Sequence, residues 1–391
     1  MSPTITRIEV DSFTYPVEGA RLDPAVQKLV YVPGETHERT AHGIRVHTDV
    51  GVTGEYIGGN GPALAQIDMC ARSLLGEDPL QRERHWASMR QGLRKYDQMG
   101  LGLLDIALWD FAGRYVDAPI HQLLGTYRER LPAYASTYFA DPEDGLDSPA
   151  AFADFAETCL EYGYPGFKTH TWCGEETTDI EREQALIRAV GERVGDRMRL
   201  MHDPVSKYET FADALAVGNV CDEYDYFWYE DPYSDGSRSQ HGNRNLRQRL
   251  DTPLLLTELV RGLEPTTDFV VNGATDFARA DPEWDGGITG AMKIARAAEG
   301  LGVDIEYHLA GPAQRHCMAA TRNTNFYELG LVHPESKRPH TEYPVYRGGY
   351  TDRIDAVDDD GTVPVPSGPG LGVEYDWEYV ESNRIDRRVY D

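Results

Sequence analysis

The feature that most constrains the fold is an alternation between short apolar runs and longer amphipathic stretches. From about residue 131, eight apolar or aromatic runs are separated by stretches with helical periodicity, such as DIEREQALIRAVGERV and ITGAMKIARAAEGLG. Strands that alternate with helices in this way are typical of βα units, which build a parallel sheet. Eight such runs over about 200 residues favour a barrel.

Seven of these runs end on a side chain that can bind a metal ion or move a proton. In (β/α) barrels the carboxyl ends of the strands meet at one mouth, and the active site lies there. We therefore expect seven side chains to converge at that mouth: His170, Asp203, Glu230, Glu258, Asp281, His308 and Glu328.

Three of these side chains, Asp203, Glu230 and Glu258, are acids at consecutive strand ends. Without a cation, three converging carboxylates would repel and raise each other's pKa. A divalent metal ion removes this conflict, and oxygen ligands without cysteine favour a hard ion, Mg²⁺ ahead of Mn²⁺. The alternative is that each acid caps a helix or pairs with an arginine, the commoner role of a single acid. Three in succession favour the metal site.

The segments on either side of the barrel differ from it in pattern. Residues 5–15 and 44–57 alternate apolar and polar positions, as half-buried strands do, whereas 61–125 has helical spacing. The tail, rich in Asp, Gly and Pro, ends in the alternating stretch GLGVEYDWEYV. We therefore expect an α+β capping domain over residues 1–130, a catalytic barrel over 131–340, and a tail over 341–391 that packs on the capping domain.

Charge and composition exclude several classes of partner. The 391 residues contain 38 Lys and Arg against 65 Asp and Glu, a net charge of −27 that repels nucleic acid and anionic membranes. The acid excess with only six lysines is typical of a halophilic protein. The N-terminus lacks a signal-peptide pattern, no apolar run reaches 18 residues, and the five cysteines lack CxxC spacing. We expect a cytoplasmic protein that binds a small molecule.

The ordered motifs resemble those of the enolase superfamily, in its mandelate racemase-like subgroup, over nearly the whole chain. ALWD followed by PIHQLLG is similar to the end of the subgroup's capping domain, and MHDP, WYEDP and LLLTE are similar to its three metal-binding strand ends. DPEWDGGITGAMKIA resembles the stretch after the sixth strand. The resemblance implies a modified (β/α)7β barrel of the TIM type beneath an α+β capping domain, with Asp203, Glu230 and Glu258 on Mg²⁺.

The resemblance also implies roles for the remaining strand-end residues. Asp281 supports His308, and such a carboxylate fixes the imidazole tautomer and raises its basicity, so the pair suits acid/base catalysis. Glu328 falls where the subgroup places an acid that hydrogen-bonds the substrate carboxylate. The alternative for His308 is a core histidine bonded to the backbone.

The run GFKTH departs from the subgroup's common Lys-x-Lys pattern. Lys168 matches the first lysine, an electrostatic partner of the substrate carboxylate, but His170 stands where the base is usual. Strand alternation places both side chains on the inward face. His170 is a second base, a hydrogen-bond donor to a substrate hydroxyl, or a neutral wall residue. Racemisation needs a base on each face of the reacting carbon, whereas dehydration needs one group that takes the α-proton and an acid that helps the β-hydroxyl leave. The replacement of the usual base by His170 therefore favours dehydration.

The residues and the resemblance together predict a Mg²⁺-dependent dehydratase that converts a sugar acid, an aldonate or aldarate, to a 2-keto-3-deoxy acid through an enolate. The alternatives are a racemase or epimerase, a lactone-forming cycloisomerase, and a non-catalytic protein that binds Mg²⁺ or an acid sugar. We expect a homo-oligomer, with specificity set by capping-domain loops at about 15–35 and 53–60.

Three further residues are considered for the site. His202 precedes Asp203 and should point away from the barrel mouth, because side chains alternate along a strand. Trp172 and Trp284 follow strand ends, where each either packs on a sugar face or closes the barrel.

Overall fold

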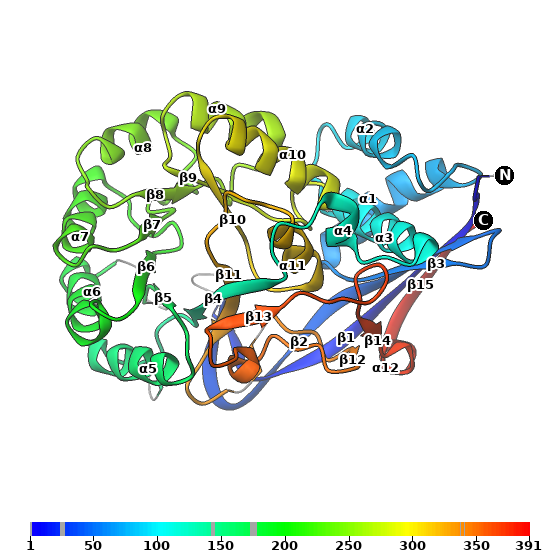
Figure 1. Cartoon of the computed structure of the whole chain (residues 1–391). Helices are drawn as coiled ribbons and strands as arrows, with labels where there is room; N and C mark the ends of the chain where they lie inside the picture. Colours follow the sequence, from blue (N-terminus) through cyan, green and yellow to red (C-terminus); the bar gives the residue numbers. More distant parts are fainter. Residues whose placement is uncertain (1, 24–27, 142–144, 173–177, 337, 340) are drawn as a thin grey trace.

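The computed structural model describes residues 2–391 except 24–27, 142–144, 173–177, 337 and 340. A curved parallel sheet with helices outside it forms the larger part of the molecule, and a smaller α+β layer packs against one side (Figure 1). Within the described residues, no helix is long and apolar enough to cross a membrane.

The larger part contains eight parallel strands in the sheet order β10-β9-β8-β7-β6-β5-β4-β11. Its strands are β4 (Arg130–Thr137), β5 (Gly166–His170), β6 (Arg199–Asp203), β7 (Trp228–Glu230), β8 (Leu254–Leu256), β9 (Phe277–Ala280), β10 (Asp304–Tyr307) and β11 (Tyr327–Val332). Its helices are α5 (Pro149–Glu161), α6 (Ile180–Val194), α7 (Phe211–Glu223), α8 (Gln240–Arg247), α9 (Leu263–Val271), α10 (Gly287–Gly300) and α11 (Pro312–Ala319). The eighth strand lies beside the first, as a barrel requires.

Large side chains fill the space inside the curved sheet. Tyr134, Met201, Trp228 and Leu255 come from four different strands and form one buried cluster, none of them exposed to solvent. A barrel interior packed in this way is solid, so functional side chains have room only at the strand ends.

The capping part is built on an antiparallel sheet in the order β15-β1-β2-β3. Its elements are β1 (Ile5–Asp23), β2 (Lys28–Thr48), β3 (Thr53–Gly58), α1 (Gly61–Cys70), the 3₁₀ helix η1 (Ala71–Leu74), α2 (Arg82–Gly92), α3 (Met99–Val116) and α4 (Ile120–Leu124). The central helix α3 is almost wholly buried because it lies between this sheet and the barrel helix α10.

The hairpin formed by β1 and β2 is longer than the sequence pattern predicts. Residues 15–18 pair with 36–39 and residues 20–23 pair with 28–31, where the sequence analysis expects a loop over about 15–35. Residues 24–27 of that loop lie outside the described residues. Pro16 lies within β1 although it lacks a backbone N–H. Because β15 pairs with β1 only from Ile8 to Phe13, Pro16 lies on a stretch with one free edge, where proline is tolerated.

The tail contacts both parts of the molecule. Its elements are β12 (Tyr346–Arg347), the 3₁₀ helix η2 (Ile354–Ala356), β13 (Thr362–Pro364), β14 (Glu374–Tyr375), α12 (Trp377–Ser382) and β15 (Arg384–Tyr390). β15 pairs with β1 of the capping sheet, as expected, whereas β13 pairs with β4 of the barrel. The tail therefore ties the two parts together, and the domain boundaries at 130 and 340 stay predictions.

The two glycines of the DPEWDGG motif make the junction between cap and barrel possible. Gly286 and Gly287 have φ of 80° and 84°, a left-handed conformation that favours glycine. A Cβ atom on Gly287 would lie 2.1 Å from Oδ2 of Asp105 in α3. That oxygen accepts the backbone N–H of Thr289 at 2.9 Å, so a capping-domain carboxylate satisfies a donor in the first turn of α10.

We predict that Gly102→Ala destabilises the protein by about 1–3 kcal/mol, the usual cost of an extra methyl group in a packed interface. A Cβ there would lie 2.1 Å from the backbone oxygen of Glu283 in the barrel, so α3 would have to move. The matched control is Gly92→Ala, because nothing lies within 4 Å of that Cβ. Urea unfolding measures both, and equal stabilities for the two variants would contradict the packing described.

Candidate metal and catalytic site

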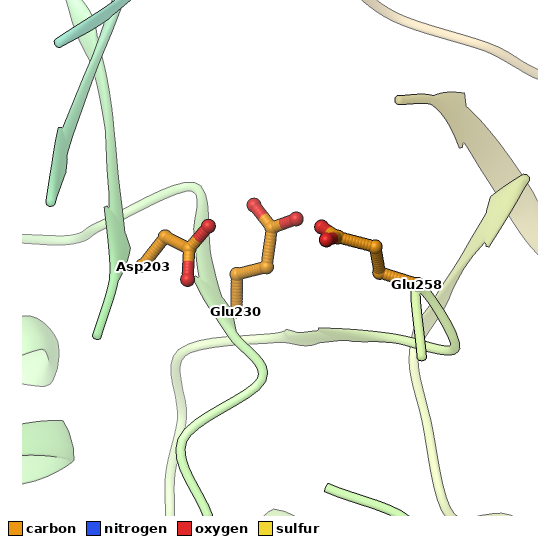
Figure 2. Close-up of side chains that lie close together, drawn as sticks. All are labelled: Asp203, Glu230 and Glu258. Atoms are coloured by element: carbon orange, nitrogen blue, oxygen red, sulfur yellow. The ribbon is translucent and has the colours of Figure 1, made fainter. Parts of the chain in front are cut away.

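Three carboxylates meet at the carboxyl ends of neighbouring strands. Asp203 ends β6, Glu230 ends β7, and Glu258 follows β8 by two residues. One oxygen from each lies within 4.8 Å of the others, and Figure 2 shows the three carboxylates facing one another. The structure therefore brings together the three acids that the sequence analysis assigns to a metal. All-oxygen donors at this spacing suit a hard divalent cation.

A strained residue directs Glu258 toward the other two acids. Thr257 has a φ of 89°, which is unusual for a β-branched side chain. Its hydroxyl accepts the Arg279 N–H at 2.9 Å and donates to the Arg279 carbonyl at 3.0 Å. Strain of this kind persists only where surrounding contacts hold it, and here β9 supplies them.

Two buried cations balance the carboxylates. Nζ of Lys168 lies 2.9 Å from Glu230, 3.1 Å from Glu328 and 3.4 Å from Asp203. Arg279 also bridges Glu230 and Glu328, with Nε 3.1 Å from the first and Nη2 2.6 Å from the second. Lys168, Glu230, Arg279 and Glu328 thus form a closed ring of alternating charge.

The ring fixes which of its members carry charge. Burial lowers the pKa of Lys168, but the Glu230 and Glu328 carboxylates outweigh it and hold that pKa well above its usual value. Burial raises the pKa of Glu328, yet Arg279 and Lys168 hold it well below the usual range. Lys168 is therefore a cation and Glu328 an anion, and Glu328 also accepts the Leu309 N–H at 2.8 Å.

His308 and Asp281 form a dyad on the opposite wall. Nδ1 of His308 lies 2.7 Å from Oδ2 of Asp281, and Nε2 lies 3.5 Å from Glu258. Burial lowers the pKa of His308, while Glu258 and Asp281 raise it, and the net shift is upward. With Nδ1 donating to Asp281, Nε2 is the nitrogen available for proton transfer. The Glu283 backbone N–H binds the other Asp281 oxygen at 2.8 Å.

His170 faces the metal-ligand cluster. Its Nδ1 donates a hydrogen bond to the Thr137 carbonyl at 2.7 Å, and its Nε2 lies 3.2 Å from Oδ2 of Asp203. Its ring also packs against Phe139. These contacts orient His170 toward Asp203, and its role in a reaction stays a prediction.

A cavity of about 550 Å³ joins the strand ends to the capping domain. Six of the predicted site residues line it, namely Lys168, His170, Asp203, Glu258, His308 and Glu328. Glu230 and Asp281 are buried behind this lining. The β1–β2 hairpin contributes the other side through Leu22, Leu29, His37 and Arg39. Gly59 contributes from beyond β3, so both segments expected to set specificity, about 15–35 and 53–60, border this space.

The additional histidine and tryptophans occupy different positions. His202 is buried away from the cavity, with its ring nitrogens near the hydroxyl groups of Thr169 and Tyr208 at 2.9 and 3.1 Å. Trp172 is buried and stacks with Arg182, whereas Trp284 lines the cavity and stacks with Arg261.

Sequence reasoning missed several charged residues of the site, among them Arg279 and Glu283. Arg279 carries a usable signal, because an arginine inside the apolar run DFARAD, two residues before Asp281, lies on the same face of the strand. Glu283 lines the cavity, but nothing distinguishes it in sequence from the many surface acids.

Comparison with known proteins places this arrangement in a family. Residues 22–125 match the N-terminal domain of mandelate racemase and muconate lactonizing enzyme, and residues 151–380 match the family described as enolase C-terminal domain-like. The chain belongs to the enolase superfamily, in its mandelate racemase-like group. The predicted family and the predicted barrel with a capping domain are confirmed.

Individual relatives cover most of the chain at modest identity. The chain is 29% identical to D-galactarolactone cycloisomerase of Agrobacterium fabrum, over 86% of this chain and 89% of the relative. It is 26% identical to D-xylonate dehydratase of Haloferax volcanii, over 88% and 85%. A crystal structure of D-glucarate dehydratase from Agrobacterium tumefaciens complexed with magnesium superposes with a TM-score of 0.84 at 29% identity, covering 98% of this chain and 99% of that one.

We predict that Glu258→Gln weakens Mn²⁺ binding roughly 100-fold, because even groups that only orient metal ligands cost about 10–100-fold when changed. Titration followed by electron paramagnetic resonance measures the free ion directly. Glu306→Gln is the control, since Glu306 is also a buried barrel glutamate but binds Asn325 instead of the cluster. Equal affinities for the two variants would remove Glu258 from the metal site.

Proposed function

We propose that the protein is a Mg²⁺-dependent dehydratase of a sugar acid, an aldonate or aldarate, that yields a 2-keto-3-deoxy acid. The observation that carries the proposal is the placement of the three-carboxylate cluster and the His308–Asp281 dyad around one cavity. The dehydratases among the relatives support this reaction class. Mn²⁺ can substitute for Mg²⁺, because both ions prefer oxygen ligands.

The proposed roles follow from the contacts of each residue. Asp203, Glu230 and Glu258 would hold the ion, which when bound stabilises the negative charge that develops on a substrate carboxylate. Lys168 adds a second positive charge at the cavity floor, where Glu230, Glu328 and Asp203 keep it in place.

His308 would take the proton from the carbon next to that carboxylate. Its Nδ1 bond to Asp281 leaves Nε2 with a lone pair at the cavity surface, and the Asp281 carboxylate stabilises the imidazolium that forms. Glu328 orients Lys168 from the other side, and His170 would contact the substrate near Asp203. The homo-oligomeric state, cytoplasmic location and halophilic character stay predictions.

A lactone-forming cycloisomerase is the second candidate, because the 29% identical relative from Agrobacterium fabrum carries that activity in its name. Both reactions begin with abstraction of the same proton. In the dehydratase reaction water then leaves the substrate, whereas in the cycloisomerase reaction an oxygen of the substrate itself adds to the carbon chain or departs from it. A racemase would instead return the proton to the opposite face of the same carbon.

We predict that incubation with a panel of aldonic and aldaric acids in D₂O gives a 2-keto-3-deoxy acid, detected by NMR, and that EDTA abolishes its formation. A lactone product would identify the cycloisomerase. Deuterium in recovered substrate without loss of water would favour the racemase or epimerase. No reaction with any panel member would contradict the proposed function.

We predict that His308→Asn lowers turnover by about 10²–10⁴-fold, the usual contribution of a general base. His241→Asn is the control. His241 lies on the outer helix α8, and among the described residues its hydrogen-bond partner is Asn245. Steady-state rates with the best panel substrate measure the effect. Unchanged turnover in His308→Asn would show that His308 is not the general base.

A further inference from the structure

Glu283 is a barrel residue whose carboxyl group is held by the capping domain. It lies in the loop between β9 and α10, two residues after Asp281. The Tyr56 hydroxyl donates to its Oε1 at 2.7 Å, and the Gly59 N–H donates to its Oε2 at 3.2 Å. Both donors come from the end of β3. Glu283 borders the same cavity as His308 and the metal-ligand cluster.

The capping domain is shaped to receive this side chain. A Cβ atom on Gly58 would lie 2.1 Å from Oε1 of Glu283, so any larger residue there would displace the carboxyl group. Gly102 of α3 leaves space for the Glu283 backbone in the same way. The position of this carboxyl group at the cavity wall is therefore fixed from two directions.

The surroundings of Glu283 favour its protonated form near neutral pH. Burial and the Asp281 carboxylate raise the pKa of Glu283 to about 7, against the lowering effect of the Tyr56 and Gly59 hydrogen bonds and of the Arg39 charge. The other titratable groups that interact with it are the Tyr15 and Tyr343 phenols. A carboxylic acid with a pKa close to the ambient pH is well suited to donate a proton in catalysis.

We propose that Glu283 is a second catalytic residue, the general acid that protonates the hydroxyl group leaving the β-carbon of the substrate. This inference rests on the proposed dehydratase function and assigns its two proton transfers to two different residues. His308 takes the α-proton, and Glu283, on the side of the cavity formed with β3, assists departure of the hydroxyl. Each group then performs one transfer in the elimination.

The step balances as follows. The α-carbon–hydrogen bond breaks, its proton goes to Nε2 of His308, and its electron pair moves toward the carboxylate to form an enolate. The electron pair then returns to form the carbon–carbon double bond between the α- and β-carbons as the hydroxyl group leaves. The β-carbon–oxygen bond breaks as Glu283 gives its proton to that oxygen, so water leaves and Glu283 becomes a carboxylate. The resulting enol becomes the ketone when the β-carbon receives the proton from His308 and the enol proton returns to Glu283. No oxidant or reductant is required.

The decisive experiment separates the two proton transfers with Glu283→Gln. For the sugar acid that wild type dehydrates best in D₂O, we expect dehydration to fall about 10²–10⁴-fold. Deuterium should still enter the α-position of recovered substrate, since His308 is intact. A substrate analogue with fluorine in place of the β-hydroxyl should lose fluoride at a rate within a fewfold of wild type, because fluoride departs without an acid.

Tyr56→Phe tests the inference without changing Glu283. Activity that requires protonated Glu283 is present below its pKa and is lost as the pH rises through it, so wild-type kcat should fall above about pH 7. The Tyr56 hydrogen bond lowers that pKa, so its removal should move the alkaline limb of the profile to higher pH. A Tyr56 role confined to packing would change the rate without moving the limb.

Several results would overturn the inference while the proposed function stands. These are a parallel loss of deuterium exchange and dehydration in Glu283→Gln, an unchanged dehydration rate, or a Tyr56→Phe profile with its alkaline limb in the wild-type position. Failure of the proposed function has a different signature, because wild type itself would then dehydrate no panel acid, whether or not it exchanges deuterium. If Glu283→Gln does not fold, the Tyr56→Phe profile decides.

Discussion

The structure depends on holding several like charges together in a place that water barely reaches. Neighbouring parallel strands bring their ends within a few ångströms, so the acids that end β6 and β7 and follow β8 are forced into contact range. Burying such groups is costly unless opposite charges meet them in good geometry. Lys168 and Arg279 do so by alternating with Glu230 and Glu328 in a closed ring. Beside this ring, one oxygen from each of Asp203, Glu230 and Glu258 lies within 4.8 Å of the others, a spacing that a divalent ion can bridge.

The second constraint is the contact between the barrel and its cap. The loop after β9 carries Asp281 for the dyad, Glu283 for the cavity wall and the paired glycines that receive Asp105 from α3. A single short segment therefore orients His308 and also forms the contact surface for the capping domain. Disturbance of the interface would reach the dyad directly, because the Glu283 backbone N–H binds Asp281.

Much of this was predictable from the sequence because it depends on order along the chain. Strand ends in a barrel converge whatever the details of packing, so Asp203, Glu230 and Glu258 were predictable as a group, and motif order indicated the family. The length of the β1–β2 hairpin was not, because the pairing of residues 15–23 with residues 28–39 depends on contacts between two segments and not on a pattern within either one. The partners of His170 and Glu283 were also hidden, since they are set by contacts between segments far apart in sequence.

The two capping-domain glycines that face residue 283 differ in what they constrain. Gly58 makes room for the glutamate side chain, whereas Gly102 makes room for the main chain at the same residue. In a homologous enzyme with short side chains at positions 56 and 283, the glycine corresponding to Gly58 would be free to vary, while the one corresponding to Gly102 would not. Positions 58 and 283 are thus expected to change as a pair during divergence.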